Sequence, residues 1–219
     1  MSEQLVYALW GLGDRTGDLL GAEFRDRLAC EWVQVNLDDA HVATAQLRLT
    51  AFDEPAQAFV TLPPDVHPDA VLQDFCEEYA GWRVDTEEPI APPMYPDGAR
   101  ADALANIAVL RRPEELPYDE WLYLWKDEHT PVGIADQGNF GYVQHRVLEA
   151  VTRDAPDVSA IVEELFPMAA LTDFHAFYGT HGDEALLSER MNRMLASVAK
   201  FGADRDIDVV PTSRYRWSG

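Results

Sequence analysis

His129 is the residue whose neighbours most strongly suggest chemistry. It follows Trp125 by one helical turn and Trp121 by two, so it shares the buried stripe of an aromatic helical segment. Pro131 disfavours helical geometry at Thr130, so we expect the helix to end near the histidine. Because an imidazole titrates near neutral pH, His129 is predicted to exchange a proton with a carbonyl or an enol as general acid/base. The alternative is a histidine that caps the helix by bonding its last carbonyl groups.

The strand expected to follow this helix alternates two sets of side chains. One set offers hydrogen bonds to a ligand oxygen and a guanidinium that could hold an enolate or carboxylate; it consists of Tyr142, Gln144 and Arg146. If the intervening valines pack under the helices, this set lines the barrel interior. With the faces reversed, His145 enters the interior instead. A structural ladder of satisfied polar groups is the alternative to both.

Three further side chains are candidates for binding a ligand. His175 and Tyr178 are expected on opposite faces of a neighbouring strand, and Trp125 could form an aromatic wall, although aromatic residues at helical spacing more often belong to the core. His181 follows in a turn, but its spacing from His175 is not that of a close metal-ligand pair. We therefore predict no metal site and no cofactor.

The composition restricts the class of partner. The chain of 219 residues carries a net charge of −22, which would repel phosphate backbones and anionic lipid surfaces, so we expect neither nucleic acid nor a membrane as partner. Cys30 and Cys76 lie far apart, which indicates free buried thiols in a reducing cytoplasm. The amino terminus lacks the pattern of a signal peptide, and we expect a cytoplasmic protein. The motifs for nucleotide binding, serine hydrolysis and dithiol redox chemistry do not occur.

The elements that must position these residues follow a repeated pattern. Each half of the chain predicts the order β-α-β-β-α-β. In the first half we expect strands at 5–12, 42–52, 58–62 and 82–86, and helices at 21–33 and 68–81. In the second half we expect strands at 104–111, 139–151, 172–178 and 207–215, helices at 117–129 and 184–201, and an inserted helix at 158–166.

The two halves also match in register. Phe24 and Leu28 correspond to Trp121 and Trp125 at a separation of 97, and Gln46 corresponds to Gln144 at 98. Residues 1–88 then form a degenerate ferredoxin-like repeat, 89–103 a proline-rich linker and 104–219 the second repeat. Packing the two sheets face to face predicts an α+β fold of two tandem repeats in one eight-stranded α/β barrel, able to hold a small ligand.

The segment from Tyr118 to Val132, with its aromatic helix ending in His-Thr-Pro, and the following F-G-Y-V-Q-H-R-V resemble the EthD-like members of the dimeric α+β barrel superfamily. The resemblance is best over residues 104–217. It implies a cleft for small apolar molecules, and relatives that include polyketide cyclases and dehydratases, muconolactone isomerase, cofactor-independent monooxygenases and, more distantly, haem enzymes. A homodimer is permitted but not required, because the repeat closes the barrel within one chain.

The predicted function is cofactor-independent cyclisation, dehydration or isomerisation of a small apolar or aromatic substrate, polyketide-like or catabolic. His129 would act as general acid/base. The alternatives are a non-catalytic protein that binds a hydrophobic small molecule, and a haem- or metal-dependent oxidoreductase.

Overall fold

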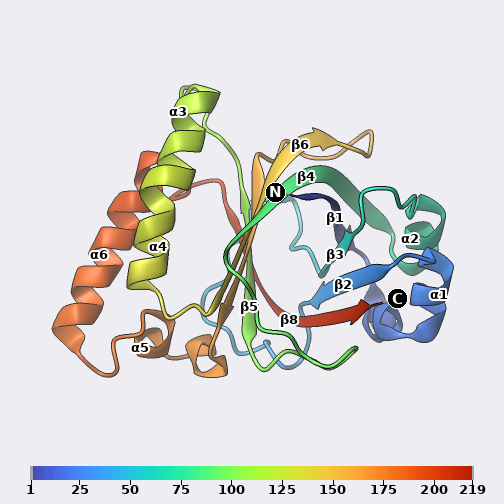
Figure 1. Ribbon diagram of the computed structural model, residues 1–219, viewed down its shortest axis with the longest axis horizontal. Helices are drawn as coiled ribbons and strands as arrows, with labels where there is room; N and C mark the ends of the chain where they lie inside the picture. Colours follow the sequence, from blue (N-terminus) through green and yellow to red (C-terminus); the bar gives the residue numbers. More distant parts are fainter. Residues whose placement is uncertain (1, 219) are drawn as a thin grey trace.

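Eight strands close into one barrel, which confirms the α+β barrel predicted from the repeated pattern (Figure 1). The computed structural model describes residues 2–218. Around the barrel the order is β1-β3-β2-β8-β5-β7-β6-β4, and neighbouring strands are antiparallel. The strands are β1 Ser2–Trp10, β2 Trp32–Leu37, β3 Ala58–Leu62, β4 Glu78–Ile90, β5 Leu104–Leu110, β6 Gly141–Ala150, β7 Ala160–Phe166 and β8 Asp208–Ser218.

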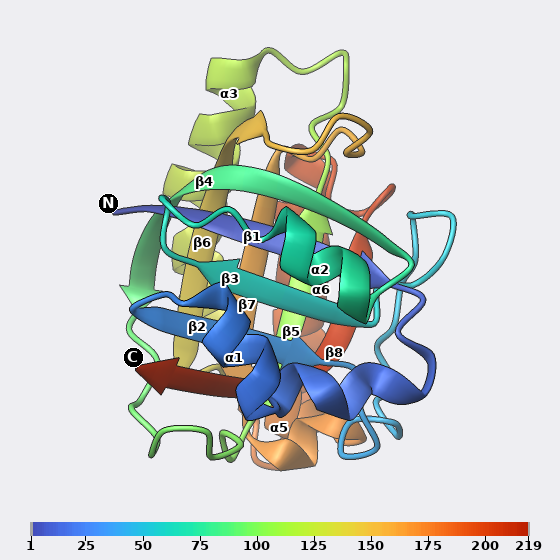
Figure 2. The same cartoon turned by 90° about the vertical axis from the view of Figure 1, so that its right-hand side faces the viewer.

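Each half of the chain contributes four neighbouring strands and the helices that cover them. Strands β4-β1-β3-β2 form one half of the barrel and β8-β5-β7-β6 the other, joined where β2 pairs with β8 and β4 with β6. Figures 1 and 2 show the two groups of helices on opposite sides of the barrel. They are η1 Gly13–Leu20, α1 Ala22–Leu28 and α2 Asp69–Phe75 on one side, and α3 Tyr118–Tyr123, η2 Leu124–His129, α4 Thr130–Asp136, η3 Met168–Leu171, α5 Phe174–Phe177 and α6 Glu184–Lys200 on the other.

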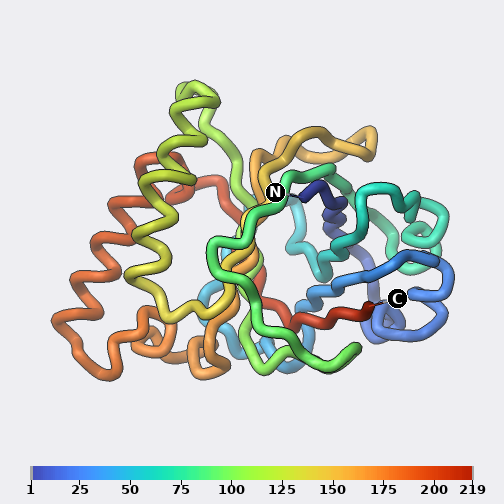
Figure 3. Tube along the Cα trace, viewed as in Figure 1, coloured from blue at the N-terminus to red at the C-terminus, as the bar shows by residue number. Residues whose placement is uncertain are grey.

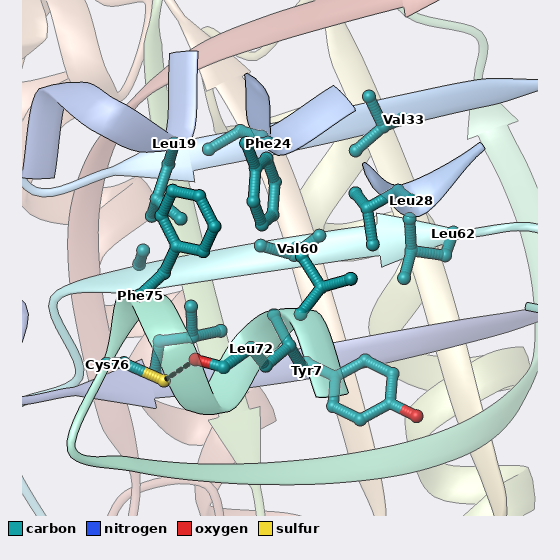
Figure 4. Packing of buried hydrophobic residues seen from close by; sticks show 14 of the residues in the cluster. Tyr7, Leu19, Phe24, Leu28, Val33, Val60, Leu62, Leu72, Phe75 and Cys76 are labelled. Atoms are coloured by element: carbon teal, nitrogen blue, oxygen red, sulfur yellow. Dashed lines mark hydrogen bonds between the residues drawn. The ribbon is translucent and has the colours of Figure 1, made fainter. Parts of the chain in front are cut away.

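Side chains along each strand alternate between the barrel interior and the helix-covered outside. On the outer face of the first-half sheet, a buried apolar cluster under α1 and α2 includes Tyr7, Phe24, Leu72 and Phe75 (Figure 4). A second cluster, which includes Phe59 and Trp82, fills part of the barrel interior. The helices of the second half cover a third, centred on two tryptophans of the aromatic segment.

Two predictions in the second half are wrong: a predicted helix is a strand, and a predicted strand contains a helix. Residues 158–166, expected as an inserted helix, contain strand β7, and residues 172–178, expected as a strand, contain helix α5. Strand β7 is covered on both faces, by the barrel interior and by the helices, so its apolar residues do not alternate and imitate a helical stripe. Helix α5 begins where the side chain of Asp173 accepts a hydrogen bond from the backbone N–H of His175.

In the first half the expected helix at 21–33 is too long and the expected strand at 42–52 is absent. Helix α1 ends at Leu28 because Ala29 adopts a left-handed conformation, and Trp32 already begins β2. Residues 42–52 form a connection whose one strand-like contact is a bridge from Leu49 to Val209. The proposed match of Gln46 with Gln144 is therefore wrong, since β2 is the topological counterpart of β6.

The sequence predicted that Gly81 ends a helix, but the structure places this residue in the middle of β4. Helix α2 already ends at Phe75. Gly81 pairs across the sheet with Tyr7, and a Cβ atom at position 81 would lie 2.3 Å from the Cε1 atom of that ring. The glycine therefore makes room for a buried tyrosine.

The aromatic helix continues past His129, contrary to the prediction that it ends there. Residues Leu124–His129 form a π-helical turn in which the N–H of Thr130 donates to the carbonyl of Trp125, and α4 follows without a break (Figure 3). Pro131 lies in the first turn of α4, where a missing N–H does little harm. Single π turns inside helices often accompany functional sites.

Candidate functional site

A cavity of about 150 Å³ lies between the outer face of the second-half strands and the helices that cover them. Its walls come from β5, β6, β7, α6 and the π-helical turn. A cavity of roughly this size in a protein core holds one benzene ring. Most of the lining is apolar, and it includes Asn106, Trp125, His129, Tyr142, Glu164 and Phe201.

His129 borders this cavity, which lies outside the barrel and is not the barrel cleft expected from the sequence, and its pKa differs from the near-neutral value expected. Its Nδ1 atom lies 3.0 Å from the Oγ atom of Ser197 on α6, and its ring packs against Phe201 with 4.9 Å between ring centroids. Burial lowers its pKa to about 4. The imidazole is therefore neutral at physiological pH, and Nε2 can exchange a hydrogen bond with a ligand.

Of the two arrangements predicted for β6, the structure has the second, in which His145 enters the barrel. Val143 and His145 point into the barrel, and Tyr142 and Gln144 lie under the helices. Tyr142 lines the cavity and its hydroxyl accepts a hydrogen bond of 3.0 Å from the amide of Gln144. Arg146 lies nearer the edge, bound to Asp85 at 2.9 Å, and does not line the cavity.

Gln144 connects Tyr142 to the π-helical turn. Its amide nitrogen also donates to the hydroxyl of Thr130 at 2.8 Å, and its amide oxygen accepts from Lys126 at 2.9 Å. The side chain is fully buried and all its polar atoms have partners. Gln144 thus holds the wall of the cavity in place, and both N–H groups of its amide are already engaged.

His145 lies on the other side of the sheet from the cavity. Its Nδ1 atom is 2.9 Å from the hydroxyl of Thr86 inside the barrel. Burial, the largest influence, lowers its pKa to about 4, and Glu163 acts in the opposite direction. His145 is a neutral part of the barrel core.

His175 and Tyr178 lie on or beside helix α5, where the sequence predicted a strand. The Nδ1 atom of His175 lies 2.7 Å from the hydroxyl of Thr180, and Nε2 lies 3.3 Å from Glu184, so both ring nitrogens have partners away from the cavity. Tyr178 caps α5 and does line the cavity, as does Trp125. Four of the eight predicted site residues therefore meet at one cavity: Trp125, His129, Tyr142 and Tyr178.

Glu164 was missed by the sequence interpretation and is the acidic group of the site. It borders the cavity from β7, where it pairs across the sheet with Tyr142 and accepts a hydrogen bond of 3.0 Å from Asn139. In the amide orientation that gives both its oxygen and its nitrogen a partner, Gln137 donates from its nitrogen to the same carboxylate oxygen at 2.8 Å. Burial raises the pKa of Glu164 to about 7, and these hydrogen bonds only partly oppose the rise.

The neighbouring Glu163 points the opposite way, into the barrel. It accepts hydrogen bonds from Gln34 and Asn36, and its carboxylate lies 3.2 Å from the Nε atom of Arg214. A strand interpretation of I-V-E-E-L-F would have placed one glutamate on each face of the sheet. The helix expected at 158–166 concealed this signal.

Asn106 is the second polar side chain of the cavity that the sequence did not indicate. It lies on β5 directly across the sheet from Glu164 and is 5% exposed. Its Oδ1 atom is buried without a partner, and among residues 2–218 its amide forms no side-chain hydrogen bond. A buried acceptor without a partner is costly, and the Nδ2 group, which also lacks a side-chain partner among these residues, can donate to an oxygen-bearing ligand.

The barrel interior itself is occupied by side chains. One part holds the apolar cluster that includes Trp82, and the rest holds the polar network around Glu163. Within residues 2–218, no group of three or more histidine, cysteine, aspartate or glutamate side chains is placed to hold a metal ion. In the same part of the chain, no helix combines the length and apolar character needed to cross a bilayer.

Comparison with known proteins supports the fold. No protein-family model matches the sequence, and no curated protein matches it. Among solved structures, an anthrone oxidase-like protein is similar with a TM-score of 0.58 and 9% identity, covering 99% of this chain and 92% of its own. A candidate monooxygenase from Lactobacillus acidophilus NCFM is similar with a TM-score of 0.53 and 9% identity, covering 100% of this chain and 97% of its own. At this identity the likeness supports the α+β barrel fold alone and carries no reaction over.

Proposed function

We propose that the protein is a cofactor-independent enzyme that moves a proton on a small, ring-sized ketone, enol or phenol. The observation that carries the proposal is the pairing of Glu164, whose pKa is about 7, with the neutral His129 in one mostly apolar cavity. A general base is most effective when its pKa lies near the working pH. Glu164 meets this condition, whereas His129, with a pKa of about 4, is a weak base.

One side chain of the cavity acts on a carbon atom of the ligand, and two others bind its oxygen atom. The carboxylate of Glu164 takes the proton from the carbon next to the carbonyl, and the electron pair of the broken C–H bond forms the enolate. The amide of Asn106 and the Nε2 atom of His129 are positioned on the same cavity to hydrogen-bond the enolate oxygen. A neutral imidazole at the oxygen beside a carboxylate base with a suitably tuned pKa is an effective pair for enolisation.

The product depends on the fate of the enolate. Return of the proton to a different carbon gives isomerisation, loss of a β-hydroxyl gives dehydration, and attack on a second carbonyl gives cyclisation. These are the reactions implied by the EthD-like resemblance, and they remain part of the proposal. The names of the two structural neighbours point to oxidation, and an enolate or phenolate is also the electron-rich species that an oxidation would need.

Exchange of hydrogen for deuterium tests the proton step without knowledge of the natural substrate. Cyclohexanone is incubated with the protein in D₂O, and loss of the α-proton signal is followed by NMR. We expect Glu164→Gln to slow enzyme-dependent exchange by about 10²- to 10⁴-fold, and His129→Gln to slow it less. The matched control Glu114→Gln changes an exposed glutamate and should exchange like the wild type. Equal exchange by wild type and Glu164→Gln would rule out the base.

Ligand binding measured on the same samples separates an enzyme from a carrier. Saturation-transfer NMR with phenol and cyclohexanone reports whether the cavity binds one-ring molecules. Binding without any enzyme-dependent exchange would favour the non-catalytic binding protein. In that case affinity would depend on the aromatic wall formed by Trp125 and Phe201 and hardly on Glu164.

A further inference from the structure

A second pocket, of about 250 Å³, opens at the end of the barrel where β8 finishes. Its walls are interior-facing side chains of three strands and the proline-rich segment between β4 and β5; they include Gln4, Glu88, Arg214 and Arg216. The second-half sheet separates this pocket from the cavity of the proposed active site, because Arg214 lies on the interior face of β8 and Val209 on the outer face. The proposed function makes no use of it.

Two arginines lie side by side in this pocket with different partners. Arg214 is 8% exposed, donates to the Gln34 amide oxygen at 2.7 Å, and lies 3.2 Å from the Glu163 carboxylate. Its charge is therefore balanced inside the barrel. Arg216 stacks on the ring of Trp32, with 4.3 Å from the guanidinium carbon to the ring centroid. Among residues 2–218, it forms no ion pair and no side-chain hydrogen bond.

The acidic groups near Arg216 do not neutralise it. Glu88 and Asp97 line the pocket but are both exposed, and neither forms an ion pair with Arg216. Asp97 instead accepts hydrogen bonds from the backbone N–H and the hydroxyl of Ser218. Burial, and then the nearby charge of Arg214, lower the pKa of Arg216. The charges of Glu88, Glu163 and Asp97 oppose this decrease of the pKa only in part. A half-buried guanidinium beside a second cation is a costly arrangement unless an anion joins it.

The remaining wall is stiff and fixed to β8. The backbone N–H groups of Gly98 and Ala101 donate to the carbonyls of Arg216 and Arg214, each at 2.9 Å. In Figure 3 the same segment runs alongside the end of β8. Prolines 92, 93 and 96 line the pocket and restrict the backbone, so little conformational entropy is lost when a ligand enters.

We propose that this barrel-mouth pocket binds a small carboxylate or phosphate anion, held by the free N–H edge of Arg216 with Arg214 behind it. The planar guanidinium suits bidentate contact with either anion, and Trp32 fixes the plane of the group. The site is separate from the proposed proton-transfer chemistry. Anion binding can therefore be measured whether or not the protein has turnover.

Isothermal titration calorimetry with inorganic phosphate and with malonate, at constant ionic strength, tests the proposal. We expect saturable binding of at least one anion, and a loss of about tenfold or more in affinity in Arg216→Gln. Arg216→Lys should restore affinity only in part, because it keeps the charge and loses the bidentate contact. Glu88→Gln should strengthen binding by up to about fivefold, because it removes a negative charge at the rim.

The control is Arg153→Gln, which makes the same change of net charge at an exposed arginine away from the pocket. It should bind the anion like the wild type. Equal affinities in wild type and Arg216→Gln, or an equal loss in Arg153→Gln, would overturn the proposal, as would absence of saturable binding for both anions. If Arg216→Gln does not fold, the opposite changes expected for Arg216→Lys and Glu88→Gln decide the outcome. The preferred anion then identifies the carboxylate or phosphate class.

Discussion

Two adjacent glutamates show how one residue position decides the chemistry of a side chain. Glu163 enters the barrel and meets amides and an arginine, whereas Glu164 faces a cavity and meets only neutral partners. Burial without a cation is what raises the pKa of Glu164 to about 7. The same side chain is therefore a structural anion on one face of β7 and a candidate base on the other.

The raised pKa of Glu164 predicts a pH-dependent contribution to stability. In the unfolded chain this carboxyl loses its proton near its ordinary pKa of 4.5, and in the folded protein near 7. The folded state thus binds more protons between these values, and stability falls as the pH rises from about 4.5 through 7. Glu164→Gln keeps a neutral side chain of similar size. We expect it to match the wild type at pH 5 and to exceed it at pH 8 by roughly 2–4 kcal/mol.

Urea unfolding of both proteins at pH 5 and pH 8 measures this difference. Exposed Glu114, changed to glutamine, controls for the loss of one negative charge from a very acidic chain. If Glu164→Gln is less stable than the wild type at pH 8, the carboxylate must be ionised at little cost there. That result would remove the basis for its role as a tuned base.

His129 has the opposite linkage to pH. Its folded pKa of about 4 lies below its ordinary value of 6.5, so its neutral form stabilises the fold above about pH 6.5, and that stability is lost as the pH falls toward 4. We expect the imidazole of His129 to remain neutral down to about pH 5, which NMR titration of its Cε1 proton would show. His129→Gln identifies the signal by its absence. A midpoint near 6.5 would instead mean that the ring is solvated and does not face the mostly apolar cavity.

At the scale of elements, the helix of the site combines a π turn with a glycine beside two residues that line the cavity. Gly133 lies in α4, and a Cβ atom there would lie 3.8 Å from Tyr142 Cε1 and 3.9 Å from His129 Nε2. It would also lie 3.3 Å from Gln137 Oε1, the end of a flexible side chain, which must shift by a few tenths of an ångström. Gly133→Ala should stabilise the helix by about 0.5–1 kcal/mol. The added methyl group should also weaken binding of one-ring ligands by about fourfold, the value of one lost methylene contact. Thermal unfolding and ligand titration together test this opposite pair of effects, and unchanged affinity would place the ligand elsewhere.

Strand β4 depends on a glycine for a different reason. A Cβ atom at Gly81 would overlap the buried ring of Tyr7, so Gly81→Ala should cost about 1–3 kcal/mol by overpacking. That cost lowers the unfolding temperature of a chain of this length by at least about 2 °C. Gly17→Ala is the matched control, because a Cβ atom there has no neighbour within 4 Å. Equal unfolding temperatures for the two variants would show that Tyr7 moves aside freely.

Elements with one exposed face could be predicted from the sequence, whereas strands covered on both sides gave mixed results. Helix α6 was predicted from its amphipathic pattern and its closing Gly202, and β5 from a short apolar run. Strand β7 was misread because both faces are buried and its pattern lacks alternation. The same error hid Glu164, whereas Asn106 was missed on β5, a strand that was predicted correctly. One misread strand thus explains the missing acid, and the missing amide needed the packed fold to reveal its unpartnered oxygen.

At the scale of the whole molecule, the cavity of the proposed active site lies outside the barrel, while side chains fill the barrel interior except at its mouth. The sequence predicted a ligand inside the barrel, but the interior holds the apolar cluster with Trp82 and the network around Glu163. Helices packed on the outer face of the second half leave the cavity instead. The first half has its sheet and helices joined by a closely packed apolar cluster (Figure 4), and this cluster holds no residue of the cavity.

The net charge of −22 acts on the whole molecule rather than on any single site. Repulsion between like charges is stronger in the compact state than in the unfolded chain, and dissolved salt screens it. Most ion pairs at the surface add little stability, so their screening should not cancel this gain. We therefore expect sodium chloride to raise the unfolding temperature at pH 8 as its concentration increases from about 0.02 M to 0.3 M. At pH 5, close to the pI of about 4.4, net repulsion is small and the same salt should have much less effect. A salt effect of equal size at both pH values would show that screening of net charge is not its cause, and that the acidity of the chain does not limit its stability.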